Sequence, residues 1–123
     1  MSEFWKNRSV FLTGGHGFLG SHIRAGLENL GAEVLAPKRF ELDLLDKKSL
    51  LSFILKNAPG IVIHMAGVVG GIKYNISHHA KLLYENIQTS LNLFECLREI
   101  SHRLEKVVCI GSACSYPRPA PNP

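Results

Sequence analysis

A glycine-rich segment between a short apolar run and a helical pattern constrains this sequence more than any other feature. Residues 9–13 form an apolar run typical of a buried strand, and glycines follow at Gly14, Gly17 and Gly20. Apolar residues then recur at helical spacing up to a stop signal at Gly31. In strand–turn–helix units of this kind the first glycine allows a tight turn, the second lets a phosphate approach the backbone, and the third lets the helix pack closely. We predict a pyrophosphate-binding turn; the alternative is a turn with a structural role only.

Strand and helix patterns alternate along the rest of the chain. The predicted strands are residues 9–13, 33–36, 41–42, 61–66 and 106–110, and the predicted helices follow the first strand, follow a cap at Asp46, and begin near Ser77. Continuous apolar strands alternating with helices indicate an α/β fold with a parallel sheet that is covered on both faces. We predict a doubly wound Rossmann sheet of about five strands in the order 3-2-1-4-5. Residues 1–116 are expected to form this domain, and residues 117–123 a proline-rich tail.

Two cations at the end of the second predicted strand bear on the choice of cofactor. Lys38 and Arg39 stand where an NAD site usually carries a carboxylate for the ribose 2′-hydroxyl. A guanidinium can grip a 2′-phosphate with two hydrogen bonds, so these residues favour NADP over NAD. The alternative is that both are ordinary loop residues. Asp43 and Leu44 follow the short third strand, and we expect them near the adenine, although Asp43 could equally serve a turn or a cap.

Small residues also follow the fourth predicted strand, where the ligand of such a fold crosses the sheet. Met65, Ala66 and Gly67 would let a cofactor lie against the backbone, and the alternative is a loop whose glycines serve only a turn. The complete set predicted to bind the cofactor is Gly14, Gly15, His16, Gly17, Phe18, Leu19, Gly20, Lys38, Arg39, Asp43, Leu44, Met65, Ala66 and Gly67.

Ser112 and Cys114 follow the fifth predicted strand. In extended chain they would point the same way, so both could face one cleft. A hydroxyl can hydrogen-bond a substrate carbonyl, and a thiol of lowered pKa can move a proton. On spacing alone, small residues leaving a strand are the simpler interpretation. Ser112 and Cys114 are nevertheless our candidate catalytic residues.

Composition excludes several other classes of function. The net charge of +4 suits an anionic ligand, but the basic residues are scattered and predict no nucleic-acid binding. We find neither an apolar leader at the start nor a run long enough to span a bilayer, and three cysteines without metal-type spacing indicate reduced thiols in the cytoplasm. The adjacent His78 and His79 would face different ways on a helix, so we predict no metal site.

Three segments together resemble one family. Residues 13–20, 68–72 and 111–117, with Tyr84-Glu85-Asn86 on the helix between the last two, are similar to the extended short-chain dehydrogenase/reductases, which are nucleotide-sugar epimerases and dehydratases, and most of all to their GDP-L-fucose synthase branch. The resemblance implies an NADP-dependent epimerase/reductase, homodimeric as a whole enzyme, that acts on a GDP-linked 4-keto-6-deoxy sugar. It implies that Ser112 binds the reacting sugar and that Cys114 transfers protons in epimerisation.

One element of the family pattern is missing from these residues. Its members assist hydride transfer with a tyrosine and a lysine four residues later, but Tyr74, Tyr84 and Tyr116 are followed at that distance by histidine, glutamine and alanine. We therefore expect the N-terminal portion of an enzyme, without its substrate domain and inactive alone. The alternatives are a stand-alone, non-catalytic dinucleotide-binding module, or another nucleotide-sugar epimerase or dehydratase that uses NAD.

Overall fold

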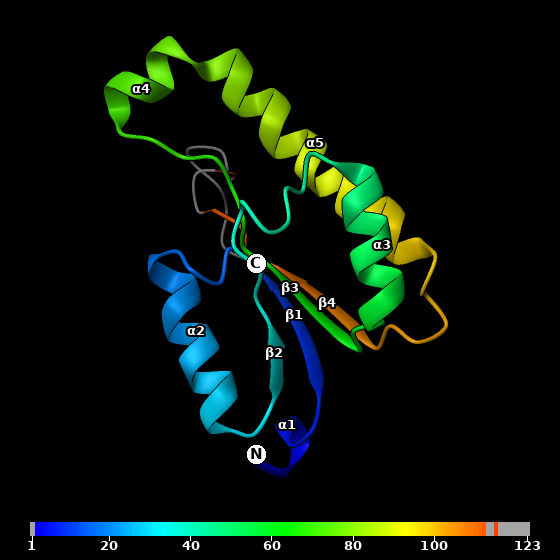
Figure 1. Cartoon of the computed structure of the whole chain (residues 1–123). Coiled ribbons are helices and arrows are strands. Elements are labelled where there is room, and N and C mark those ends of the chain that lie inside the picture. The colour runs from blue at the N-terminus through cyan, green and yellow to red at the C-terminus, as the bar shows by residue number, and fades with distance from the viewer. Residues whose placement is uncertain (1, 113–114, 116–123) are drawn as a thin grey trace, which may run out of the picture.

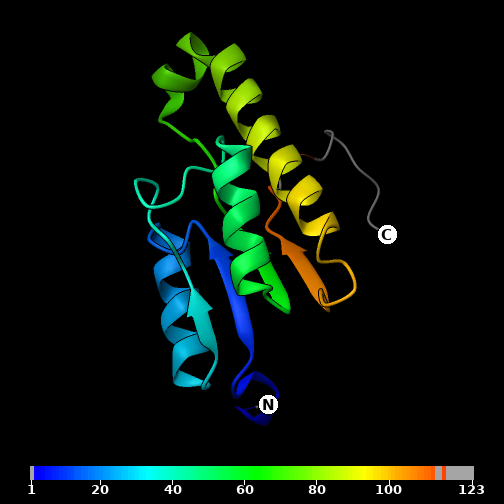
Figure 2. The ribbon, with the colours of Figure 1, turned by 45° about the vertical axis from the view of Figure 1, so that its right-hand side comes forward.

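The chain folds into an open parallel sheet with helices on both faces (Figures 1 and 2). The computed structural model describes residues 2–112 and residue 115. Its elements are α1 (Ser2–Trp5), β1 (Ser9–Thr13), α2 (Phe18–Asn29), β2 (Glu33–Leu35), α3 (Lys47–Asn57), β3 (Ile61–His64), α4 (Ile72–Ser77), α5 (His79–Arg98) and β4 (Lys106–Cys109). The strand order is β2-β1-β3-β4, and every pair is parallel. The predicted doubly wound α/β fold is confirmed.

Alternate residues of the central strands build two cores, one on each face of the sheet. Phe11 and Val62 point to the face covered by α3 and α5, where they pack with Leu50 and Leu93. Their neighbours in sequence point to the other face and pack against α2, largely through Leu27. This alternation explains why β1 and β3 are apolar throughout: each is buried on both sides, as central parallel strands are.

Local signals set the ends of the helices. Asp46 accepts hydrogen bonds from the backbone N–H groups of Lys48 and Ser49 at 3.1 and 3.2 Å, so it caps α3 as predicted. A hydrogen bond from the Ser49 hydroxyl, together with these backbone bonds, lowers the pKa of the Asp46 carboxyl. At its other end α3 stops at Ala58, which takes a left-handed conformation with φ of 39°.

The predicted third strand near Glu41 and Leu42 is wrong. This segment is a turn in which the backbone N–H groups of both residues donate to the carbonyl of Lys38, at 2.9 and 3.0 Å. Leu42 is nevertheless buried, because its side chain joins the core beneath α3 and α5. The described part of the chain therefore forms a four-stranded sheet rather than about five strands.

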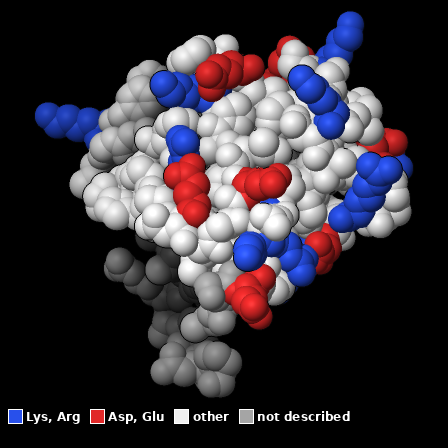
Figure 3. All heavy atoms as spheres, turned by 60° about the horizontal axis from the view of Figure 1, so that its bottom comes forward, with Lys and Arg blue, Asp and Glu red and all other residues white. Residues whose placement is uncertain are grey.

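The surface agrees with the scattered distribution of charge in the sequence. On the face shown in Figure 3, basic and acidic side chains are interspersed, and the described residues there form no continuous basic patch. Among the described residues, no helix combines the length and the apolar character needed to cross a membrane.

Candidate functional site

A pocket of about 250 Å³ lies across the carboxyl ends of β1, β2 and β3. Loops that follow these three strands form its walls, because parallel strands present their carboxyl ends at one edge of the sheet. The lining residues are Phe11, Thr13, Gly14, Gly15, His16, Gly17, Pro37, Lys38, Arg39, Leu42, Asp43, Leu44, Leu45, Ala66, Gly67, Val68 and Thr89.

The glycine turn after β1 forms the first wall, and its geometry requires glycine at two positions. Gly14 has φ of +73°, and a Cβ there would lie 2.9 Å from the backbone nitrogen of Ala66. A Cβ on Gly20 would lie 2.0 Å from the carbonyl oxygen of Gly14. The turn is thus pressed against the end of β3 on one side and against α2 on the other.

Gly17 differs from these two glycines. A Cβ at this position would meet only the carbonyl oxygen of Gly14, at 3.3 Å. Gly17 is also the N-cap of α2, with extended backbone and no side-chain cap. The first N–H groups of a helix attract an anion, and Gly17, which directly precedes those of α2, lines the pocket without adding a side chain to it. These features fit a pyrophosphate at this point.

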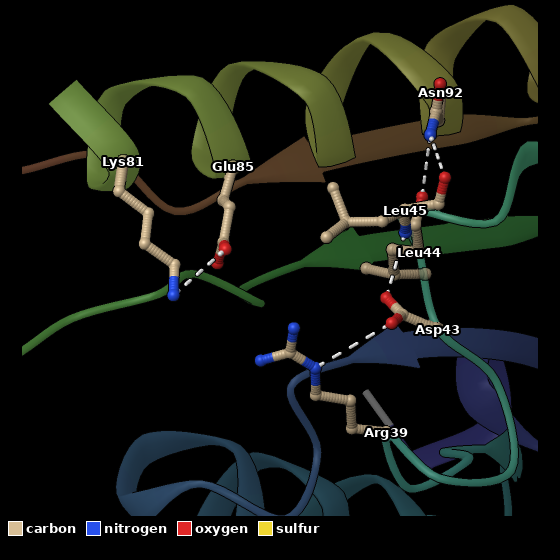
Figure 4. A network of polar contacts seen from close by, with 7 residues as sticks. All are labelled: Arg39, Asp43, Leu44, Leu45, Lys81, Glu85 and Asn92. Atoms are coloured by element: carbon tan, nitrogen blue, oxygen red, sulfur yellow. Dashed lines mark hydrogen bonds and ion pairs between the residues drawn. The ribbon is translucent and has the colours of Figure 1, made fainter.

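The loop after β2 forms the second wall and carries both predicted cations. Arg39 lies with its Nε 4.0 Å from Oδ2 of Asp43, and 66% of its side chain is exposed (Figure 4). Nζ of Lys38 lies 5.7 Å from the ring centroid of Phe40. Asp43 accepts a hydrogen bond from the backbone N–H of Leu45 at 3.0 Å, so it serves a turn as well as lining the pocket. Two cations at the pocket's edge suit a phosphate.

His16 joins the first wall to the second. Its Nε2 lies 2.8 Å from the carbonyl oxygen of Ala36, the residue that follows β2. A carbonyl can only accept, so Nε2 carries the hydrogen and donates. The glycine turn is thus tied to the strand end from which Lys38 and Arg39 emerge.

The loop after β3 forms the third wall and is tied to β1 through Thr13. Oγ1 of Thr13 accepts hydrogen bonds from the backbone N–H groups of Met65 and Ala66, both at 3.1 Å. The hydroxyl hydrogen is then left for Nδ1 of His64, 2.7 Å away. Nε2 of His64 consequently carries the ring hydrogen and donates to Oγ of Ser90 on α5, at 3.2 Å. Burial lowers the pKa of His64, and this network also requires the neutral ring.

The structure brings most of the predicted cofactor residues together. Gly14, Gly15, His16, Gly17, Lys38, Arg39, Asp43, Leu44, Ala66 and Gly67 all line the pocket. Four others do not. Phe18 and Leu19 are exposed on the first turn of α2, Gly20 packs beneath the turn, and Met65 packs against the α2-side core.

Of the two candidate catalytic residues, the structure describes only Ser112. Ser112 comes three residues after the end of β4, outside the pocket's lining as the structure describes it, and its carbonyl accepts a hydrogen bond from the backbone N–H of Ser115 at 3.0 Å. Cys114 lies outside the described residues. The predicted convergence of these two side chains therefore stays a prediction.

Several pocket residues were not predicted. They are Phe11, Thr13, Pro37, Leu42, Leu45, Val68 and Thr89. Thr13 and Pro37 adjoin predicted residues and were within reach of a strand-end argument. Thr89 lies on α5, more than twenty residues beyond β3, and no local pattern connects it to the pocket.

An open parallel sheet with a glycine turn after its first strand, and a pocket across the strand ends, defines a Rossmann-type dinucleotide-binding domain. The model of the NAD dependent epimerase/dehydratase family matches residues 10–123. The chain belongs to this family.

Individual relatives narrow the comparison. The chain is 37% identical over 109 residues to GDP-L-colitose synthase of Yersinia pseudotuberculosis. This alignment covers 89% of the chain and 35% of the relative. It is 31% identical over 112 residues to GDP-L-fucose synthase of Azorhizobium caulinodans, covering 91% of the chain and 35% of the relative. The chain thus spans about a third of the length of these relatives.

A solved structure agrees with this picture. GDP-mannoheptose C4 reductase MlghC from Campylobacter jejuni, with NADP bound, superposes with a TM-score of 0.84 at 26% identity. The alignment covers 95% of this chain and 37% of the reductase. The chain resembles about a third of proteins that are named for GDP-linked sugars.

Proposed function

We propose that this chain is the NADP-binding portion of a GDP-L-fucose synthase-like epimerase/reductase, inactive without the rest of such an enzyme. The observation that carries the proposal is the pocket itself. It brings the glycine turn, the cations after β2 and the small residues after β3 into one cavity. Relatives named for GDP-linked sugars, and a neighbour with NADP bound, support the choice of substrate class and cofactor.

Each wall has a distinct task in this proposal. The N-terminus of α2, capped by Gly17, receives the pyrophosphate, and Arg39 with Lys38 neutralises the 2′-phosphate. Asp43 and Leu44 border the adenosine, while Ala66 and Gly67 let the cofactor run along the backbone toward the substrate. NADP, when bound, supplies the hydride chemistry.

The reacting sugar would lie beyond the end of β4. In this proposal Ser112 holds the sugar through its hydroxyl, and Cys114 moves the protons of epimerisation. Hydride transfer to a ketone also needs a group that protonates the developing alkoxide, and no Tyr-x-x-x-Lys pair occurs in these 123 residues. The complete enzyme, working as a homodimer in the cytoplasm, would provide that pair and the substrate domain.

Cofactor preference tests the proposal directly. We expect calorimetric titration to show NADPH binding at least tenfold more tightly than NADH, because a charge-assisted contact to the 2′-phosphate is worth about 1.5–3 kcal/mol. Arg39→Ala should weaken NADPH binding about tenfold and leave NADH unchanged. Arg24→Ala is the matched control, since Arg24 lies on α2 and pairs with Glu28 away from the pocket. Equal affinities of the wild-type chain for NADPH and NADH would remove the case for NADP.

A further inference from the structure

Two asparagines on α5 hold the two loop walls of the pocket. Oδ1 of Asn86 accepts a hydrogen bond from the backbone N–H of Val68 at 2.7 Å, and its Nδ2 donates to the carbonyl of the same residue at 2.9 Å. One amide side chain thus satisfies both polar groups of one pocket residue. The third wall, which follows β3, is fixed at this point by a helix 18 residues further along the chain.

Asn92 holds the second wall, which follows β2. Its Nδ2 donates to the carbonyls of Leu44 and Leu45, at 2.9 and 3.1 Å (Figure 4). Its Oδ1 accepts from Nε2 of Gln88 at 2.8 Å, which orients the amide. Asn92 is only 5% exposed, and Leu44 and Leu45 are partly buried, so the loss of these bonds would remove a hydrogen-bond donor from two carbonyls that solvent reaches only in part.

The spacing of these asparagines fixes the distance between the two walls. Asn86 and Asn92 are six residues apart on one rigid helix, which corresponds to about 9 Å along its axis. The helix is anchored to the sheet by Leu93 and Leu97, both fully buried or nearly so. The two loops are therefore held against one rigid element rather than against each other.

We propose that Asn86 and Asn92 are positioning residues that hold the two loop walls independently, and so set the separation at which the two halves of a dinucleotide are bound. This inference rests on the proposed function. Asn92 governs the wall that borders the adenosine half, and Asn86 governs the wall past the pyrophosphate. The Asn86 amide donates through its nitrogen and accepts through its oxygen, whereas an ionised aspartate can only accept and leucine can do neither, so neither residue could replace Asn86 at the Val68 peptide.

The test compares a whole ligand with one of its halves. NADPH and 2′,5′-ADP, the adenosine half, are titrated against the 123-residue chain and against Asn86→Ala, Asn92→Leu and Asn75→Ala. Asn75 lies exposed on α4, away from the pocket, and so provides a matched control. Circular dichroism and thermal unfolding establish that each variant is folded, and hydrogen exchange reports the protection of the Val68 N–H.

The ratio of the two affinities separates positioning from general destabilisation. Asn86→Ala should weaken NADPH about fivefold, leave 2′,5′-ADP within twofold, and deprotect the Val68 N–H. Asn92→Leu should weaken both ligands about fivefold, so that their ratio is unchanged. If Asn92→Leu does not fold, the Asn86 variant decides alone.

The contrary outcomes are equally clear. If Asn86→Ala weakens the binding of both ligands equally, or of neither, the inference is overturned while the proposed function stays in place. A wild-type chain that binds neither NADPH nor 2′,5′-ADP removes the proposed function and this inference with it.

Discussion

The walls of the pocket are held in two different ways. The glycine turn is fixed by backbone pressed against backbone: Gly20 leaves only 2.0 Å between the position of a Cβ and the Gly14 carbonyl oxygen. The loops after β2 and β3 are fixed by side chains that reach across from other elements, namely Thr13, Asn86 and Asn92. The first wall tolerates no added atom at its contacts, whereas the others depend on hydrogen bonds that a single substitution removes.

This difference determines what each wall contributes to binding. Close packing makes the glycine turn rigid, since helix, turn and strand cannot move separately. Loops held by a few polar side chains can be adjusted one at a time without disturbing the sheet. One pocket thus combines a rigid wall, the glycine turn, with two loop walls whose positions depend on a few side chains.

The largest expected effect comes from Gly20→Ala. The added Cβ would overlap the Gly14 carbonyl, so α2 must move away from the turn, at a cost of about 3 kcal/mol in the free energy of unfolding. Gly26→Ala lies on the same helix and is the control, because a Cβ there meets nothing within 4 Å and should stabilise by about 0.5–1 kcal/mol. Urea unfolding measures both. Similar values for the two variants would show that the turn is not closely packed.

Gly17→Val separates the role of the turn in ligand binding from its role in stability. The Cβ of the new side chain would meet only one carbonyl oxygen within 4 Å, so the free energy of unfolding should change by no more than about 1 kcal/mol. It would occupy the space proposed for the pyrophosphate, and NADPH affinity should fall at least about 100-fold. Calorimetry of the folded variant is the measurement. Unchanged affinity would leave the turn with a structural role alone.

The same difference explains how far sequence reasoning reached. The glycine turn, β1 and the Asp46 cap are local patterns, and the structure confirms each of them. The third strand was misjudged because Leu42 is buried as a loop residue, and an apolar residue alone does not report the backbone around it.

Side-chain contacts between elements that lie far apart in the sequence are the part of the site that local sequence patterns do not predict. The hydrogen bonds between Asn86 and Val68, in the loop after β3, join residues 18 positions apart in the sequence. The contact of Asn92 with residues 44 and 45, across 48 positions of sequence, was not foreseen. Each asparagine is one of many polar residues on an amphipathic helix until the fold brings its partner close.

Thr13→Val tests the side-chain attachment between β1 and the loop after β3. Valine has the same shape but no hydroxyl, so the N–H of Ala66 and Nδ1 of His64 lose their partner. We expect a loss of about 2 kcal/mol in the free energy of unfolding, the cost of leaving buried polar groups unpaired. Thr89→Val is the control, because that hydroxyl bonds only to a carbonyl of its own helix. Equal effects of the two changes would contradict a special role for Thr13.

The smallest expected effect is a pH dependence that originates at His64. Burial lowers the pKa of His64 in the folded state below the ordinary value of 6.5, so below that pH the unfolded chain binds more protons at this residue. The stability that His64 contributes is therefore complete above about pH 7.5 and is lost as the pH falls through 6.5 toward the folded-state pKa. Stability should therefore fall measurably between pH 7.5 and 5.5.

Urea unfolding at several pH values measures this loss, and His64→Gln supplies the comparison, since a glutamine amide can hydrogen-bond to Thr13 and Ser90 without titrating. The Asp46 carboxyl loses its contribution only near and below pH 3.8, so it does not interfere in this window. If the variant loses as much stability as the wild type between pH 7.5 and 5.5, another group is responsible. A flat profile for the variant, beside a sloping one for the wild type, would assign the pH dependence to protonation of His64.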